Sequence, residues 1–188
     1  ILSSAMALSG EYAWLYGGGA ASNYLETPPT PLMQEYLQAN ADAHLREPVA
    51  DTRIERTYHS GVSDGTAHYV AIHNGSGDTL YETWLKFDLT DLDPEDTQVT
   101  EATLVLWLRN DYDYGETGFA LIGVTDDTWV ETTLTGDNAP DLDSLIAWVD
   151  FDSSNVGEFT RLEIDVTDYV QASVGEGQDY LVSFALVP

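Results

Sequence analysis

Runs in which apolar and polar residues alternate at every second position dominate the body of this chain. In the clearest run, Leu85 and Phe87 alternate with Lys86 and Asp88. Successive side chains of a β-strand point to opposite faces, so this pattern predicts a strand with one buried face. Similar runs, or short apolar runs of strand length, occupy residues 103–109, 119–123, 146–151, 161–166 and 181–187.

Turn-forming clusters separate these runs. They are rich in Gly, Asn, Asp, Pro and Ser, and they cover residues 74–78, 93–96, 113–115 and 153–157. Many short strands joined by turns predict an all-β fold, a jelly-roll-like two-sheet β-sandwich. One short helix is expected at Thr167–Val174, capped by Thr167 or Asp168 and ended by Gly175.

The balance of charge excludes several classes of partner. The chain has 33 acidic side chains against 6 basic ones and a net charge of −27. This excess argues against nucleic acid and against charge-driven binding to anionic membranes, and no apolar run is long enough for membrane insertion. A saline habitat, bound calcium and cationic partners all remain open as explanations of the acidity. Cysteine is absent, which excludes disulfides and thiolate chemistry.

Residues 1–16 are expected to form one long extra strand with a bulky face; a helix is the alternative. The bulky face carries Leu2, Met6, Leu8, Tyr12, Trp14 and Tyr16. A glycine-rich segment, 17–22, and a proline-rich segment, 27–31, follow as a flexible joint and a stiff linker. Such a strand either completes its own sheet or is donated to a neighbouring copy. The start at Ile1 is interpreted as the processed end of an exported protein, which predicts an extracellular or cell-surface location.

Six different motifs follow one another through the rest of the chain. They are Ala41–Arg46, Trp84–Leu89, Thr100–Leu104, Val124–Leu134, Asp137–Pro140 and Glu163–Val170. In order and spacing they resemble the DNRLRE-type domain. The resemblance implies a secreted β-sandwich found beside polysaccharide-degrading enzymes and on cell surfaces, with some members binding alginate-like acidic polysaccharides. It divides the chain into residues 1–40, the strand and its linker, and residues 41–188, the sandwich.

Two groups of carboxylates are candidate calcium ligands, because calcium is held by several oxygen atoms at one place. Asp111, Asp113 and Glu116 belong to one loop, and Asp126 and Asp127 precede Trp129 in the best-matching motif. The alternative for the second group is a turn that orders the sandwich, with Trp129 packed in the core. Asn74 begins an Asn-Gly-Ser triplet in an expected turn and is a candidate glycosylation site. Tyrosines could stack on sugar rings, and the candidates are Tyr58, Tyr69, Tyr81, Tyr112 and Tyr114.

Catalysis finds little support in the sequence. His68 and His73 lie five positions apart and would face opposite sides of a strand, so they do not make a zinc site. No phosphate-binding loop occurs, and no pair of carboxylates stands out as an acid and base. We therefore expect a protein that is not an enzyme.

Two functions of different classes follow from these patterns. The N-terminal strand favours an extracellular filament or matrix subunit, a homopolymer assembled by donating that strand to the next copy. The resemblance favours a carbohydrate-binding module for acidic polysaccharide, attached to a polysaccharide-degrading enzyme. The filament is the main expectation and the module is the alternative. Calcium is the one cofactor that either function would use.

Overall fold

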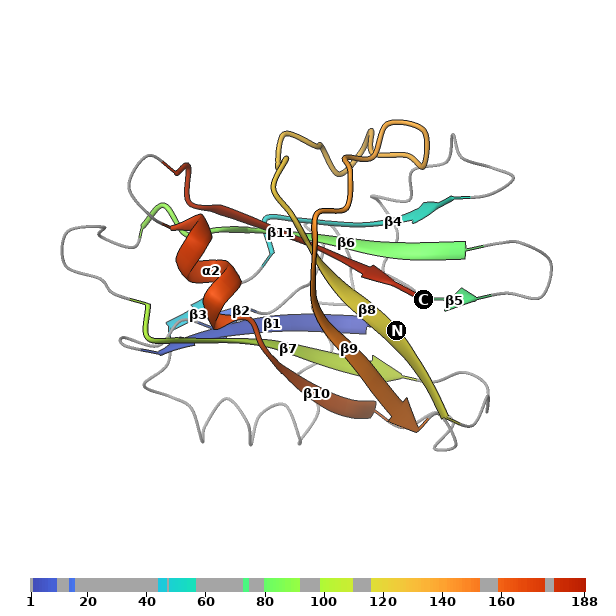
Figure 1. Ribbon diagram of the computed structural model, residues 1–188, viewed down its shortest axis with the longest axis horizontal. Coiled ribbons are helices and arrows are strands. Elements are labelled where there is room, and N and C mark those ends of the chain that lie inside the picture. The colour runs from blue at the N-terminus through green and yellow to red at the C-terminus, as the bar shows by residue number, and fades with distance from the viewer. Residues whose placement is uncertain are drawn as a thin grey trace, which may run out of the picture.

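The protein is an all-β sandwich of two sheets, as the sequence predicts, and the part of the chain that the structure describes includes one short helix (Figure 1). The computed structural model describes residues 2–9, 14–15, 44–46, 48–56, 73–74, 80–91, 99–109, 116–152, 159–174 and 178–188. The first sheet has the strand order β10-β7-β1-β3-β2, and the second has the order β4-β6-β11-β8-β9 with β5 paired to β6.

The strands of the first sheet are β1 (Leu2–Ser9), β2 (Trp14–Leu15), β3 (His44–Arg46), β7 (Glu101–Arg109) and β10 (Phe159–Asp165). Those of the second sheet are β4 (Ala50–Glu55), β5 (His73–Asn74), β6 (Leu80–Asp88), β8 (Glu116–Val124), β9 (Ser144–Asp152) and β11 (Leu181–Val187). The helix is α2 (Thr167–Ser173).

The core lies between the two sheets and is built from every second residue of their strands. Leu85 and Phe87 of β6 meet Leu104 and Leu106 of β7, and Phe184 of β11 packs edge-on against Phe87. All of these side chains are fully buried. Burying aliphatic and aromatic area of this kind is the main favourable term in folding.

Helix α2 contacts β7 and β11 and closes one end of the sandwich (Figure 1). Its start differs from the expectation that Thr167 or Asp168 caps it. The residue at the cap position is Val166, which offers no side-chain acceptor. Instead, Asp165 accepts hydrogen bonds from the Thr167 amide at 2.9 Å and the Thr167 hydroxyl at 2.6 Å. A carboxylate one residue before the cap position therefore satisfies one backbone amide of the first turn.

The N-terminal segment forms strands, so the helical alternative does not hold for Leu2–Ser9. The segment is also not one continuous strand. Strand β1 runs antiparallel to β3, whereas β2 runs parallel to β3 on its other side, so the chain reverses between them. Strand β1 lies between β7 and β3 and pairs with β7 from Leu2 to Ser9.

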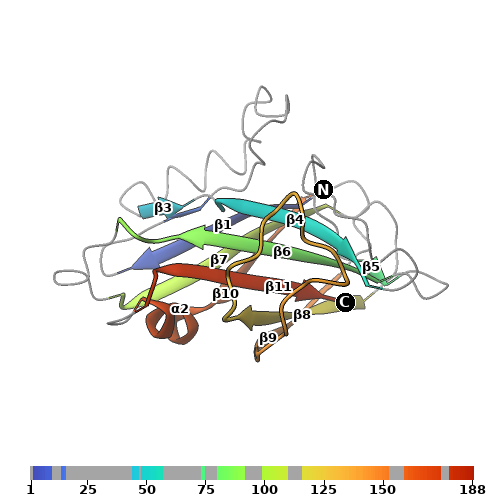
Figure 2. The same ribbon diagram turned by 90° about the horizontal axis from the view of Figure 1, so that it is seen from above.

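Part of the outer face of the second sheet is covered by residues 125–143, the loop that joins β8 to β9 (Figure 2). We call this segment the cover loop. It explains why β6 departs from a strand with one buried face: Trp84 is fully buried and Lys86 is 9% exposed, although both point away from the core between the sheets. The rest of the outer face, over β8 and β9, carries exposed side chains.

Candidate functional site

The cover loop is anchored by a tryptophan pair. Trp129 is 5% exposed and meets Trp84 of β6 edge to face, with ring centroids 6.1 Å apart. The indole N–H of Trp129 donates to the Ser183 hydroxyl of β11 at 3.1 Å. Val124, Leu134 and other apolar residues complete this second core. Trp129 therefore packs the fold and is not available to a ligand.

Lys86 joins the same cluster as a buried cation. Its ammonium group donates to the backbone oxygen of Trp129 and lies 4.4 Å from the centroid of the Trp129 ring. Burial lowers the pKa of Lys86, and the carboxylates of Asp127, Asp126 and Asp179 oppose that shift. The position of this lysine is consistent with anchoring the loop.

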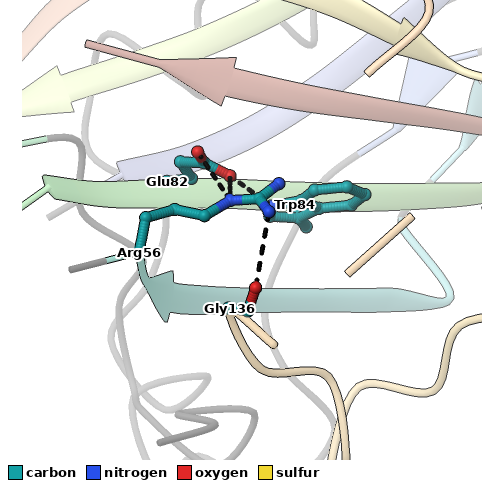
Figure 3. A network of polar contacts seen from close by, with 4 residues as sticks. All are labelled: Arg56, Glu82, Trp84 and Gly136. Carbon is teal, nitrogen blue, oxygen red and sulfur yellow. Dashed lines mark hydrogen bonds and ion pairs between the residues drawn. The ribbon is translucent and has the colours of Figure 1, made fainter. Parts of the chain in front are cut away.

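Arg56 fastens the far part of the cover loop (Figure 3). Its Nε atom donates to both carboxylate oxygens of Glu82 at 2.9 Å, and its Nη1 atom donates to the Gly136 oxygen at 3.4 Å. The indole N–H of Trp84 donates to the same carboxylate at 3.1 Å. Residue 136 must be small, because a Cβ there would lie 2.4 Å from the Glu55 oxygen.

Asp126, one of the two predicted calcium ligands of the cover loop, accepts hydrogen bonds within a turn of the loop. Asp126 accepts the Thr128 amide at 3.1 Å and the Thr128 hydroxyl at 2.6 Å, and these bonds lower its pKa. The pKa of Asp127 is raised by burial and by the nearby Asp179 carboxylate. Among the described residues, no three Asp, Glu or His side chains gather as a metal-ligand group.

Glu116, the one described member of the first predicted group of ligands, lies apart from the second group. Glu116 is the first residue of β8, and Asp126 follows the other end of that strand. A strand rises about 3.3 Å per residue, so these positions cannot share one ion. Asp111 and Asp113 lie outside the described residues, as do Tyr12 and Tyr16 of the expected interface strand.

The remaining expected positions are scattered over the sandwich. Leu2, Met6 and Leu8 belong to β1, and Trp14 belongs to β2. Asn74 ends β5, opposite Leu80 of β6. Of the tyrosines proposed to stack on sugars, Tyr81 alone falls in the described part of the chain, and it is half-buried with the Arg53 guanidinium 4.8 Å from its ring centroid.

The uncovered part of the outer face carries an exposed aromatic surface. We call it the outer platform and define it by Gly118, Ala120, Ile122, Leu145, Trp148 and Asp150. Trp148 is 58% exposed and Leu145 is 65% exposed, whereas Trp84 and Trp129 are buried. Large apolar side chains gathered on a surface commonly mark a binding site.

A hydrogen bond orients the indole of Trp148 on the platform. Its N–H donates to Asp150 Oδ1 at 2.7 Å, and the two residues point to the same side of β9. Gly118 pairs with Asp150 across the two strands, and a Cβ at Gly118 would lie 3.2 Å from the indole nitrogen and 2.9 Å from that carboxylate oxygen. The absence of a side chain at Gly118 therefore leaves room for the ring.

Sequence reasoning missed this site, because Trp148 stands in an apolar run that predicts a buried strand. The alternation of Ala147, Val149 and Phe151 with Trp148 and Asp150 is the signal that was available. It separates the two faces of β9, but it cannot show which face the cover loop leaves bare. That depends on where the loop crosses the sheet.

Comparison with known families agrees with this architecture. The family model described as carbohydrate-binding module family 96 matches residues 42–188, and no curated protein shows significant similarity to the chain. The match confirms the expectation of a domain like a carbohydrate-binding module, whereas the DNRLRE-type assignment stays a prediction. It begins next to the boundary expected at residue 41. The chain belongs to carbohydrate-binding module family 96.

Proposed function

We propose that this domain binds polysaccharide without catalysing a reaction, and that Trp148 is the residue on which a sugar ring stacks. The family supplies the class of ligand, and carbohydrate-binding modules are non-catalytic. The observation that carries the assignment of the site is the exposed indole, fixed by Asp150 above Gly118. The C–H face of a pyranose is apolar and covers an aromatic ring well, while a neighbouring carboxylate accepts hydrogen bonds from hydroxyl groups.

The rigidity of the indole supports this proposal. A side chain that is already held in place loses little conformational entropy when a ligand binds. The small residues Gly118 and Ala120 beside it keep the surface flat, and a flat surface suits an extended polysaccharide chain. The proposal places the protein outside the cell, where such polymers are found.

Affinity electrophoresis through gels containing neutral and acidic polysaccharides tests the proposal. We expect retardation by at least one polymer, and we expect Trp148→Ala to lower the affinity at least about tenfold by removing the stacked area. Val49→Ala is the matched control, because Val49 is 56% exposed but lies beside β4, away from the platform. Equal retardation of the wild type and Trp148→Ala would show that the polysaccharide does not stack on Trp148.

A filament subunit is the second candidate, and the position of β1 favours it. Strand β1 occupies an inner place in the first sheet, yet residues 2–9 precede the family match at 42–188. The matched sandwich therefore obtains a strand from outside its own boundaries. In this structure that strand comes from the same chain, and strand donation would supply it from a second copy with the same pairing.

Negative-stain microscopy of the intact protein, with calcium and with a chelator, tests strand donation. Regular fibres that disappear in Ala5→Pro are expected, because proline removes a backbone donor from β1 where it pairs with Val105. If the wild type gives only single particles in both conditions, β1 serves its own chain and the filament is excluded. Loss of fibres in the chelator would assign a role to calcium.

A further inference from the structure

The charge distribution around the outer platform bears on which polysaccharide it accepts. The chain contains no lysine or arginine between Arg109 and Arg161. Strands β8 and β9 and the cover loop therefore carry no basic side chain, and any cation near the platform has to come from another element. Of the described basic side chains, Lys86 is buried beneath the cover loop, Arg53 and Arg56 belong to the β4 side of the second sheet, and Arg161 belongs to the first sheet. None of these strands is a neighbour of β9.

The platform itself carries a negative charge next to the ring. Asp150 is exposed and points to the same side of β9 as Trp148, and Asp152, two residues further on, is also exposed. A sugar stacked on the indole lies within hydrogen-bonding reach of the Asp150 carboxylate. Neutral hydroxyl groups satisfy that carboxylate, whereas the carboxylate of a uronic acid repels it.

We propose that the outer platform selects a neutral polysaccharide over an acidic one, and that Asp150 provides part of that selection. This inference rests on the proposed function and narrows it. The acidic polysaccharide expected from the sequence resemblance would need cations to neutralise this face, and the described residues around the platform supply none. Calcium or high salt could bridge or screen the repulsion, so both belong in the test.

Alginate and the same alginate after chemical reduction of its carboxyl groups to alcohols make a matched pair of probes. The two polymers share their backbone and length and differ in charge. Binding to the intact protein is measured by isothermal titration calorimetry in low salt, in high salt, and with calcium or chelator. We expect the reduced polymer to bind at least about tenfold more tightly in low salt, and we expect the gap to shrink in high salt.

Variants at two residues separate the effect of charge from that of stacking. Asp150→Asn keeps an oxygen that can accept the Trp148 N–H but removes the charge, so we expect it to bind native alginate about threefold to tenfold more tightly in low salt. We expect the same variant to change binding of the reduced polymer little. Trp148→Phe keeps an aromatic ring without the N–H, and Trp148→Ala removes the ring; circular dichroism confirms that each variant is folded.

The outcomes distinguish this inference from the proposed function. If native alginate binds as well as the reduced polymer in low salt without calcium, and binding is lost in Trp148→Ala, the site stands but neutral selection is overturned. If neither this pair nor a panel of neutral glucans, galactans and mannans binds in a manner sensitive to Trp148→Ala, the proposed site itself fails. An effect of Trp148→Ala on self-association alone would identify the platform as a contact between copies and would overturn both.

Discussion

The ammonium group of Lys86 is a buried cation among carboxylates at the place where the cover loop meets the sheet. It binds the Trp129 backbone and faces Asp127, Asp126 and Asp179. A lone buried amine is costly, and these carboxylates offset that cost. At this residue the excess of acidic groups in the chain stabilises a specific contact.

Replacing Lys86 with methionine tests its role. We expect Lys86→Met to lower the free energy of unfolding by about 2 kcal/mol, because Asp127 and Asp179 lose their cation and the loop loses a hydrogen bond. Urea denaturation measures this change. Arg161→Met is the control, since Arg161 pairs with Glu163 at an exposed site and such pairs contribute little. Equal effects of the two variants would contradict the anchoring role.

The raised pKa of Glu131 predicts that the stability of the protein depends on pH. Burial, aided by the charge of Asp51, raises its pKa from 4.5 to about 7. Between the unfolded-state and folded-state pKa values, the folded protein binds the proton more tightly than the unfolded chain does. The free energy of unfolding therefore decreases as pH rises through this window.

Glu131→Gln should remove this part of the pH dependence. We expect the loss of stability between pH ~4.5 and ~7 to be smaller in the variant by about 1 kcal/mol, a value reduced for the partial exposure of the side chain. Asp137→Asn removes a charge from an exposed position of the same loop and is the control. Parallel profiles of melting temperature against pH for wild type and Glu131→Gln would contradict the assignment.

At the scale of elements, the cover loop decides which part of the second sheet is available. It has no regular strand, yet side chains fix it along its length: Asn138 accepts the Thr135 amide at 2.7 Å and donates to the Thr133 oxygen at 2.9 Å. Together with Arg56 and Trp129, these bonds hold the loop over β6 and β11 and leave β8 and β9 bare (Figure 2). The position of the outer platform is therefore a consequence of the loop.

Gly136→Ala tests the seating of the loop. The added methyl group would collide with the Glu55 oxygen, which is backbone and cannot turn aside. We expect a loss of about 1–3 kcal/mol in the free energy of unfolding and greater exposure of Trp129. Tryptophan fluorescence with an external quencher measures the exposure. Asp137→Ala, at the adjacent exposed position, should change neither quantity; a Gly136→Ala protein as stable as wild type would show that the contact is not close.

At the scale of the whole molecule, a net charge of −27 implies strong repulsion among carboxylates. Repulsion of this kind favours the expanded chain, and added salt screens it. The response to salt also separates two of the explanations of the acidity, because a saline habitat requires only ionic strength, whereas a calcium site requires a particular ion.

Salt should therefore stabilise the protein. We expect the melting temperature to rise by about 5 °C or more between low salt and ~1 M NaCl, since the Debye length falls from tens of ångströms to about 3 Å. Millimolar calcium added in ~1 M NaCl should then raise it no further if screening alone operates. A further rise with calcium but not with magnesium would identify a specific calcium site, and no response to NaCl would contradict the screening argument.

Particular residues show which features of the fold and the site can be predicted from the sequence alone. The alternation of Leu85 and Phe87 with Lys86 predicted strand β6 correctly, because one face of any strand in a sandwich must be apolar. The same alternation could not predict that Lys86 and Trp84 are buried on the other face, because the cover loop that buries them is distant along the chain. The motif around Asp126 and Trp129 can be recognised in the sequence. In the structure Asp126 lies in a turn and Trp129 packs in the second core.

The class of fold and the family could be predicted from the sequence, since strand periodicity and motif order are properties of the chain. Tertiary structure alone decided that β1 lies between β7 and β3, and that Trp148 is exposed while Trp84 and Trp129 are buried. The three tryptophans look alike in sequence. The exposure of Trp84 and Trp148 depends on which strand lies under the cover loop, and the position of the loop is fixed by contacts such as Arg56 with Gly136, made between residues far apart in the chain.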